Sequence, residues 1–183
     1  MKNIEELLKA HVAGKKLKYL FFWGHRPSPN GEVTSSCFSQ WWHADFKVHD
    51  QKYPTAEHWM MAEKARLFGD EIIEKRIHQA GSPGEAKKLG RLVKGFDQTI
   101  WETKRSEIVI EGNLHKFDQN PALKDFLLGT KKRILVEASP VDAIWGIGLP
   151  GDHQFAKVPP KWRGLNLLGF ALMEVRERLV LET

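Results

Sequence analysis

Cysteine is nearly absent from this sequence, since Cys37 is the only one among 183 residues. A single thiol cannot form an internal disulfide framework, and it cannot supply a thiolate-rich zinc site. No run of about 18 consecutive apolar residues occurs, so the sequence predicts no membrane-spanning helix. The opening residues, MKNIEELLKA, are charged and amphipathic rather than the apolar core of a signal peptide. We therefore expect a cytoplasmic protein with no membrane association.

Motifs for metal binding and for the common nucleophiles are also missing. No histidine stands four residues before or after His58, so the metal-binding pattern His-Glu-x-x-His is absent. The sequence has no Gly-x-Ser-x-Gly, and Cys37 lacks both a helix-start context and an adjacent base. We therefore expect no metal site and no cysteine or serine nucleophile.

The charge balance is modestly basic, with 28 Lys and Arg against 23 Asp and Glu, a formal net charge of +5. This excess favours anionic partners such as phosphates or nucleic acid, although a solubilising surface charge explains it as well. The basic clusters at 15–18 and 131–133 are too short for a disordered nucleic-acid-binding tail. Seven tryptophans are present, and large aromatic side chains either fill the core or form walls on which bases stack.

Helical signals dominate the chain. Apolar spacing predicts helices over residues 4–13, 55–68, 97–117, 120–129 and 166–181, with shorter ones that begin at 70 and 82. The expected N-caps are Thr55, Asp70, Ser82 and Asp97. Short strands are expected at 19–23, 133–138 and 143–147, with a small hairpin around Asp50 and Gln51. The sum is a mostly helical α+β fold.

The most informative stretch is PTAEHWMMAEK at 54–64. With Thr55 as the N-cap, Glu57 lies in the first turn, where the helix dipole and the free N–H groups favour an ionised carboxylate. Glu57, Met61 and Lys64 have the spacing i, i+4, i+7 and share one face of the helix. This face permits a partly buried ion pair, but the spacing alone favours a glutamate that complements the dipole and a solvated lysine.

Further candidates lie in the second half of the chain. In the stretch 136–148, Asp142 precedes an aromatic-glycine turn, where it either reaches a ligand or caps the turn. Arg163 and Asn166 lie at the start of the last helix, where a phosphate could bind. Trp101 is either a core residue or a platform on which a base stacks.

From about Tyr19 to Leu179, the sequence resembles the NADAR (YbiA-like) N-glycosidase family. The blocks that carry the resemblance are, in order, FFWGH, CFSQW, YPTAEHWMMAEKARLFGD, SPGEAKKLGRLVKGFD, GNLHKF, LVEASPVDAIWGIG and WRGLNLLGFALMEVR. So many blocks in the right order make the resemblance specific. It implies a single mostly helical α+β domain with a few short strands over residues 19–181, after an N-terminal extension of residues 1–18.

The resemblance implies hydrolysis of an N-glycosidic bond between ribose C1 and a nitrogen, without a metal or an organic cofactor. One implied substrate is ADP-ribose attached to guanine in DNA, in a protein that is often paired with an ADP-ribosylating toxin. The other is a phosphoribosylamino-pyrimidine intermediate of riboflavin synthesis. Two alternatives from other classes are a non-catalytic module that binds ADP-ribose and a general nucleic-acid-binding protein.

The family's functional residues fall on Glu57, Lys64, Trp101 and Asp142 of this sequence. A carboxylate close to C1 would stabilise an oxocarbenium-like state and orient water, whereas a desolvated lysine would attack the opened sugar as a Schiff-base nucleophile. Both mechanisms stay open. The other residues expected to contact the substrate are Trp23, Gly24, His25, Ser39, Gln40, His58, Arg91, Trp145, Gly146, Arg163 and Asn166.

Overall fold

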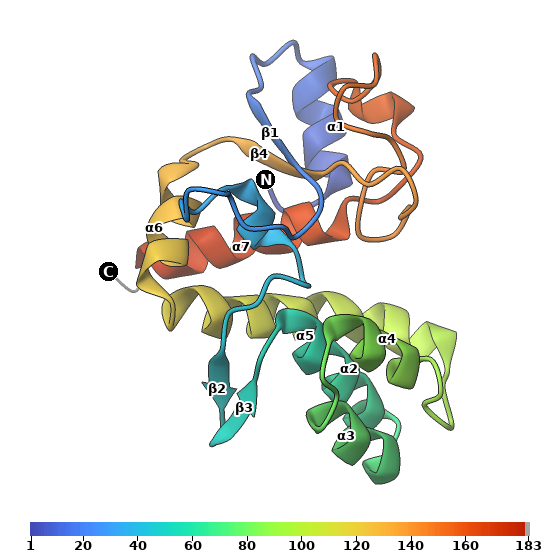
Figure 1. The fold of residues 1–183 in the computed structure, drawn as a ribbon. Coiled ribbons are helices and arrows are strands. Elements are labelled where there is room, and N and C mark those ends of the chain that lie inside the picture. Colours follow the sequence, from blue (N-terminus) through green and yellow to red (C-terminus); the bar gives the residue numbers. More distant parts are fainter. Residues whose placement is uncertain (182–183) are drawn as a thin grey trace. The chain divides into compact units, whose positions relative to one another are not determined.

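The computed structural model of the protein describes residues 1–181, which form two compact units. The first unit combines residues 1–39 with the chain from 122 onward, and the second unit is the continuous segment 40–121 (Figure 1). The second unit is therefore an insertion in the sequence of the first. Helices supply most of the regular structure, so the expected mostly helical α+β class is confirmed. Among residues 1–181, no helix is both long enough and apolar enough to cross a membrane.

A parallel pair of strands organises the first unit. Strand β1 (Tyr19–Phe22) pairs with β4 (Ile134–Glu137), in register from Tyr19 opposite Ile134 to Phe22 opposite Glu137. Parallel neighbours need a long connection, and here the whole second unit lies between the two strands in the sequence. Because the strands are parallel, the chain leaves both of them at the same edge of the pair.

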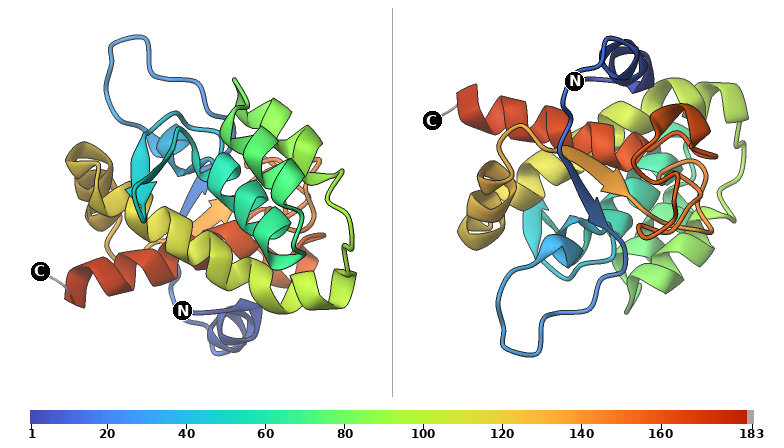
Figure 2. Two further views of the ribbon diagram at one scale, coloured as in Figure 1. Left: turned by 90° about the horizontal axis from the view of Figure 1, so that it is seen from below. Right: turned by 90° about the horizontal axis from the view of Figure 1, so that it is seen from above.

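Three helices complete the first unit: α1 (Ile4–Val12), α6 (Pro121–Gly129) and α7 (Leu167–Leu181). Two short 3₁₀ helices, η1 (Ser35–Phe38) and η2 (Pro159–Lys161), pack against β1 and α1 respectively. Helix α7 packs against β4 (Figure 2). The apolar stripe expected on this last helix is buried, as predicted, and consists of Leu168, Leu172, Val175 and Leu179.

Helix α2 (Ala56–Leu67) is the centre of the second unit (Figure 1). It packs against α3 (Glu71–His78), α4 (Pro83–Gly90) and α5 (Gln98–Asp118). Every one of these helices except α5 is short, so the unit depends on packing between helices rather than on the stability of any one of them.

Two glycines allow α4 and α5 to approach α2 closely. A Cβ at Gly90 would lie 2.1 Å from Met61 Sδ, and a Cβ at Gly112 would lie 2.2 Å from Trp59 Cδ1. Real side-chain atoms do not approach this closely, so any larger residue would force the helices or the side chains on α2 to move. Glycine at these positions fixes the spacing of the three helices.

A two-residue hairpin joins β2 (Phe46–Val48) and β3 (Gln51–Tyr53) in the second unit. The turn residues, His49 and Asp50, have φ values of 46° and 66°. Positive φ at both central residues is the geometry that matches the twist of a tight hairpin. The expected hairpin is confirmed, but its turn is one residue earlier than predicted, because Gln51 already belongs to β3.

The capping predictions are confirmed. The side chains of Thr55, Asp70, Ser82 and Asp97 each accept a hydrogen bond from the backbone N–H three residues later. Each cap satisfies one of the N–H groups that a helix leaves without a partner in its first turn. Local sequence therefore determines where all four helices of the second unit begin.

The strand expected at 143–147 is wrong, because these residues form consecutive turns. Asp142 Oδ1 accepts the N–H groups of Ile144 and Trp145, both at 2.8 Å. The carbonyl groups of 143–146 accept N–H groups from 165–168. The carbonyl groups of this segment are thus occupied by the start of the last helix, which leaves them unavailable for a strand ladder.

Asp70 ties two elements together, and its charge contributes to stability. Its carboxylate accepts the N–H groups of Lys94, at 2.9 Å, and Ile73, at 3.1 Å. These hydrogen bonds, led by that of Lys94, hold the pKa of Asp70 below its usual value of 3.8. The charged form therefore stabilises the fold above pH 3.8, and this contribution is lost as the pH falls through the lowered folded-state pKa.

We therefore expect Asp70→Asn to have a lower free energy of unfolding than the parent protein at neutral pH. In acid, this difference between the two proteins should disappear. Urea unfolding of both proteins, at neutral pH and at several values below 3.8, measures the difference. A difference that stays constant over this range would contradict the assignment.

Candidate functional site

Glu57 is buried in the first turn of α2, with only 2% of its surface exposed. Its backbone N–H donates to the Gln40 carbonyl oxygen at 2.9 Å. The Gln40 side chain in turn accepts a hydrogen bond from Asn113 Nδ2 of α5, at 2.7 Å. Gln40 Nε2 is buried and has no hydrogen-bond partner within residues 1–181. A buried amide donor of this kind is normally completed by water or by a ligand, so Gln40 is suited to contact a substrate beside Glu57.

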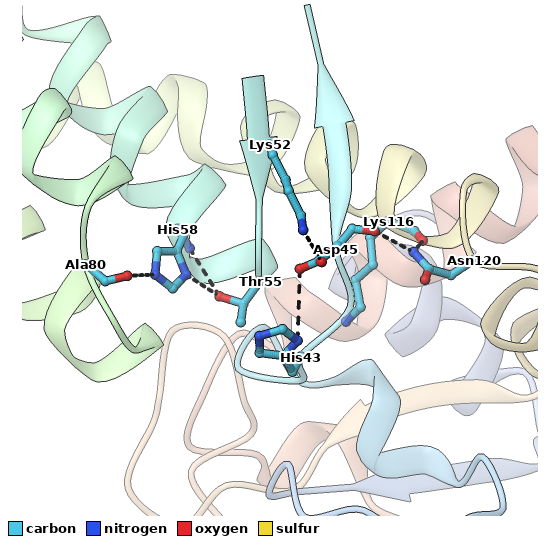
Figure 3. A network of polar contacts seen from close by, with 8 residues as sticks. All are labelled: His43, Asp45, Lys52, Thr55, His58, Ala80, Lys116 and Asn120. Carbon is cyan, nitrogen blue, oxygen red and sulfur yellow. Dashed lines mark hydrogen bonds and ion pairs between the residues drawn. The ribbon is translucent and has the colours of Figure 1, made fainter. Parts of the chain in front are cut away.

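His58 follows Glu57, and its ring links two segments of the second unit (Figure 3). Nδ1 lies 2.8 Å from Thr55 Oγ1, and Nε2 lies 3.1 Å from the Ala80 carbonyl oxygen. A carbonyl oxygen only accepts, so Nε2 carries the proton and the Thr55 hydroxyl donates to Nδ1. Burial lowers the pKa of His58, which keeps the ring neutral. Both ring nitrogens are therefore engaged in holding the start of α2 to the chain after α3.

Lys64 is half-buried in the last turn of α2, and its amine contacts a carbonyl group and aromatic rings. Nζ donates to the Gly90 carbonyl oxygen at 2.8 Å and lies 4.2 Å from the centroid of the Phe96 ring. Burial, and next the positive charge of Arg91, lowers the pKa of Lys64 from its usual 10.5. A larger fraction of the amine is thus neutral near physiological pH than for an exposed lysine.

The ion pair predicted for the Glu57–Lys64 face is absent, and the alternative is confirmed only for the first-turn position of Glu57. Lys64 forms no ion pair with any residue of the described chain, so the proposed buried pair with Glu57 is absent. Lys64 is not fully solvated either, because its amine donates a hydrogen bond to the carbonyl oxygen of Gly90 on α4. Glu57 does lie in the first turn, but burial distinguishes it from an ordinary surface glutamate.

Trp101 and Arg91 lie close to the Lys64 amine. Trp101 is buried in the first turn of α5, and its ring centroid is 5.8 Å from Lys64 Nζ. Arg91 is exposed at the end of α4, directly after the glycine that binds the amine. An amine, a guanidinium and an indole are thus gathered in one unit. This set can bind a phosphate, border an aromatic base and supply a nucleophile.

The candidates in the first unit lie around the turns after β4. Asp142 Oδ1 caps the turn by accepting two backbone N–H groups, so the capping role is present. Its Oδ2 takes no hydrogen bond and no ion pair within residues 1–181, and the residue is half-buried. The same side chain therefore fixes its turn with one oxygen and leaves the other for a ligand.

Asn166 joins these turns to the open side of β4. Its buried side chain accepts the Glu137 N–H at 2.9 Å and donates to the Leu135 carbonyl at 3.0 Å. Its own N–H donates to the Gly146 carbonyl at 3.0 Å. Arg163 is exposed in the adjoining loop. Asn166 thus uses its side-chain groups to hold the loop, while the Arg163 guanidinium remains accessible to an anion.

The segment after β1 begins at the same strand edge. The Ala138 N–H donates to the Phe22 carbonyl at 2.9 Å, so the chain leaves β1 and β4 together. Trp23 is 60% exposed there, and Gly24 and His25 are also exposed. The edge at the carboxyl ends of parallel strands is a common ligand-binding position.

The sequence candidates therefore fall into two groups, one in each unit. The first unit holds Trp23, Gly24, His25, Ser39, Asp142, Trp145, Gly146, Arg163 and Asn166, and the second unit holds Gln40, Glu57, His58, Lys64, Arg91 and Trp101. In the first unit, Asp142 binds the Trp145 N–H directly, and in the second, Lys64 and Trp101 are near neighbours. Within the described chain, no three His, Cys, Asp or Glu residues are grouped so that they could hold a metal ion.

Sequence reasoning missed two residues of the second unit. Phe96 covers the Lys64 amine, and Asn113 holds the Gln40 side chain. Phe96 follows a glycine in an irregular segment, where no periodicity indicates a contact. Asn113 offered a weak signal, because a polar residue on the apolar face of a long helix is often satisfied by a functional partner.

The family model described as the NADAR domain matches residues 21–180. N-glycosidase R617 of Acanthamoeba polyphaga mimivirus is 45% identical over 165 residues, which cover 87% of this chain and 95% of that protein. N-glycosidase YbiA of Escherichia coli K12 is 33% identical over 147 residues, with coverages of 80% and 81%. The NMR structure of Escherichia coli YbiA matches with a TM-score of 0.72 at 29% identity, covering 90% of this chain and 86% of that chain.

Proposed function

Because this chain belongs to the NADAR family, whose YbiA-like relatives are N-glycosidases, we propose that it hydrolyses the bond between ribose C1 and the nitrogen of a base. We propose further that the substrate is ADP-ribose attached to guanine in DNA, the product of a guanine-modifying ADP-ribosylating toxin. The observation that carries the proposal is the half-buried Lys64 amine, with a lowered pKa and with Trp101 and Arg91 beside it. An indole suits a purine base, and paired cations suit the diphosphate.

The carboxylates support a route in which water attacks. Breaking the C1–N bond develops positive charge on C1 and the ring oxygen, and a fixed carboxylate stabilises that charge. Glu57 is suited to this role because burial strengthens its electrostatic effect, and Asp142 because its Oδ2 has no protein partner within residues 1–181.

Lys64 supports a second route. The lone pair of its neutral Nζ attacks C1, and the C1–N bond electrons leave with the base, which takes up a proton. Loss of a proton from nitrogen then opens the bond to the ring oxygen, giving an imine and a sugar hydroxyl. Water hydrolyses the imine to the free aldehyde of the ribose and the free amine. A carboxylate close to C1 would stabilise the developing charge in this route as well.

A product assay by mass spectrometry tests the proposed reaction. The protein is incubated with a guanine-ADP-ribosylated oligonucleotide and, separately, with a phosphoribosylamino-pyrimidine. We expect release of ADP-ribose, and we expect Glu57→Gln and Asp142→Asn each to lower its rate by at least about 100-fold. The amide introduced by Asp142→Asn keeps an oxygen that can cap the turn, so this variant removes the charge while retaining the local structure.

Three other results would change the assignment. Cleavage of the pyrimidine alone would make the protein a metabolite N-glycosidase and remove DNA from the proposal. Binding of free ADP-ribose without turnover of either substrate would leave a non-catalytic module. Full activity in both carboxylate variants would place the chemistry on other residues.

A further inference from the structure

An open hollow of about 630 Å³ in the first unit has lysine and arginine as four of its seven lining residues. Lys15, Lys18, Arg133 and Lys157 contribute four positive charges, and His11 adds an imidazole. No carboxylate of the described chain lines it. We call this set of five residues the basic hollow.

The parallel strand pair explains how the basic hollow forms. The two short basic clusters at 15–18 and 131–133 are far apart in the sequence, but each comes directly before one strand of the pair. The Ile134 N–H donates to the Lys18 carbonyl at 2.8 Å, so the pairing continues into these clusters. Parallel strands have their starts at the same edge, and this brings Lys15 and Lys18 of the first cluster and Arg133 of the second to one surface.

The charges of the basic hollow are not neutralised within the protein. None of its four Lys and Arg side chains forms an ion pair with a residue of the described chain, and all four are exposed. By sequence, the first unit has 15 Lys and Arg against 10 Asp and Glu, whereas the second unit has 13 of each. The whole formal excess of +5 therefore belongs to the unit that carries the hollow.

We propose that the basic hollow binds the phosphate backbone of a DNA strand. Lysine and arginine groups in an open hollow attract successive phosphates and release their counterions. The four charged groups are donors suited to phosphate oxygens, and no carboxylate or amide side chain lines the hollow, so we expect binding to depend little on base sequence. Its two other residues, Leu17 and Tyr19, are half-buried, which leaves no exposed large apolar side chain for insertion into a membrane.

The basic hollow would bind the substrate and take no part in breaking the C1–N bond. Lys15 and Lys18 precede the segment that matches the family model, so half of the lysine and arginine groups lie outside the matched region. The role in substrate binding rests on the proposed function, because only a DNA substrate has a backbone to bind. Binding of unmodified DNA can be measured without turnover, so the two proposals can fail separately.

The test compares two variants of equal charge change. One is K15Q/K18Q/R133Q/K157Q, and its matched control is K47Q/K75Q/K88Q/K104Q, which removes four exposed lysines from the second unit. Fluorescence anisotropy with an unmodified single-stranded oligonucleotide gives Kd at several salt concentrations. We expect the first variant to bind at least about tenfold more weakly and the slope of log K against log salt to decrease by about 3. The control should stay within about twofold of the parent protein.

A charge-conserving variant, K15R/K18R/K157R, separates charge from folding and should retain binding. Equal losses in the first variant and the control would overturn the proposal, because they would show a general charge effect. Absence of DNA binding by the parent protein would overturn it too. So would binding to vesicles containing phosphatidylserine with no binding to DNA, since the hollow would then face a membrane.

Discussion

Lys64→Arg is expected to lower turnover by at least about a thousandfold and to abolish any covalent adduct trapped by borohydride. Arginine retains the positive charge and can still lie over the Phe96 ring, but it stays protonated and offers no nucleophilic nitrogen. The parent protein, incubated with substrate and borohydride, should give an adduct located on Lys64 by peptide mass spectrometry. Release of ADP-ribose by the parent without any adduct would instead favour water attack assisted by Glu57 or Asp142.

The pH dependence of trapping gives an independent check on the same amine. Only the neutral amine attacks, so the adduct should form faster as the pH rises and level off above the lowered pKa of Lys64, below 10.5. Arg91 contributes to that lowering, so Arg91→Gln should move the rise to higher pH. An unchanged pH profile in Arg91→Gln would show that the charge of Arg91 does not act on the Lys64 amine.

Gly112→Ala is expected to lower the free energy of unfolding by about 3 kcal/mol. The added Cβ would lie 2.2 Å from Trp59 Cδ1, so the indole or the α5 backbone must move. Movement of Trp59 would also disturb the hydrogen bond from its Nε1 to the Ile108 carbonyl, which measures 2.7 Å. Differential scanning calorimetry should show the midpoint lowered by roughly 6–12 °C.

Gly129→Ala is the matched control for this substitution. Gly129 also lies in a helix, but a Cβ there meets nothing within 4 Å. We expect the change to be neutral or to stabilise by up to about 1 kcal/mol, since alanine favours the helix. A similar loss in both variants would mean that glycine is needed for backbone conformation rather than for close packing.

Local signals were sufficient to predict most of the fold. Thr55 and Asp97 cap helices because a short polar side chain before an apolar repeat satisfies the first-turn N–H groups. The 143–147 segment has the β-branched and aromatic content of a strand, yet it forms turns. Its hydrogen-bond partners come from Asp142 and from 165–168, and no local pattern indicates a contact at that distance.

The candidate site was less predictable than the fold. Spacing placed Glu57 and Lys64 on one helix face and offered Glu57 as an ion-pair partner, which the amine does not have in the structure. The amine binds the Gly90 carbonyl because that glycine lets α4 approach α2, which is a property of packing between helices. For Asp142, the structure confirms the predicted capping role, which uses Oδ1 alone, and the ligand-binding role stays a prediction.

The interruption of the first unit by the second has a consequence for synthesis on the ribosome. Tyr19 pairs with Ile134, 115 positions later, so β1 emerges long before its partner strand exists. The second unit is continuous and built from neighbouring helices, whose contacts are local and form quickly. It can therefore fold before β4 has been synthesised. At that stage residues 1–39 have no partner from the later part of the first unit, and the apolar face of β1 is uncovered. During translation, this unpaired apolar strand is therefore open to association with other chains until β4 has been made.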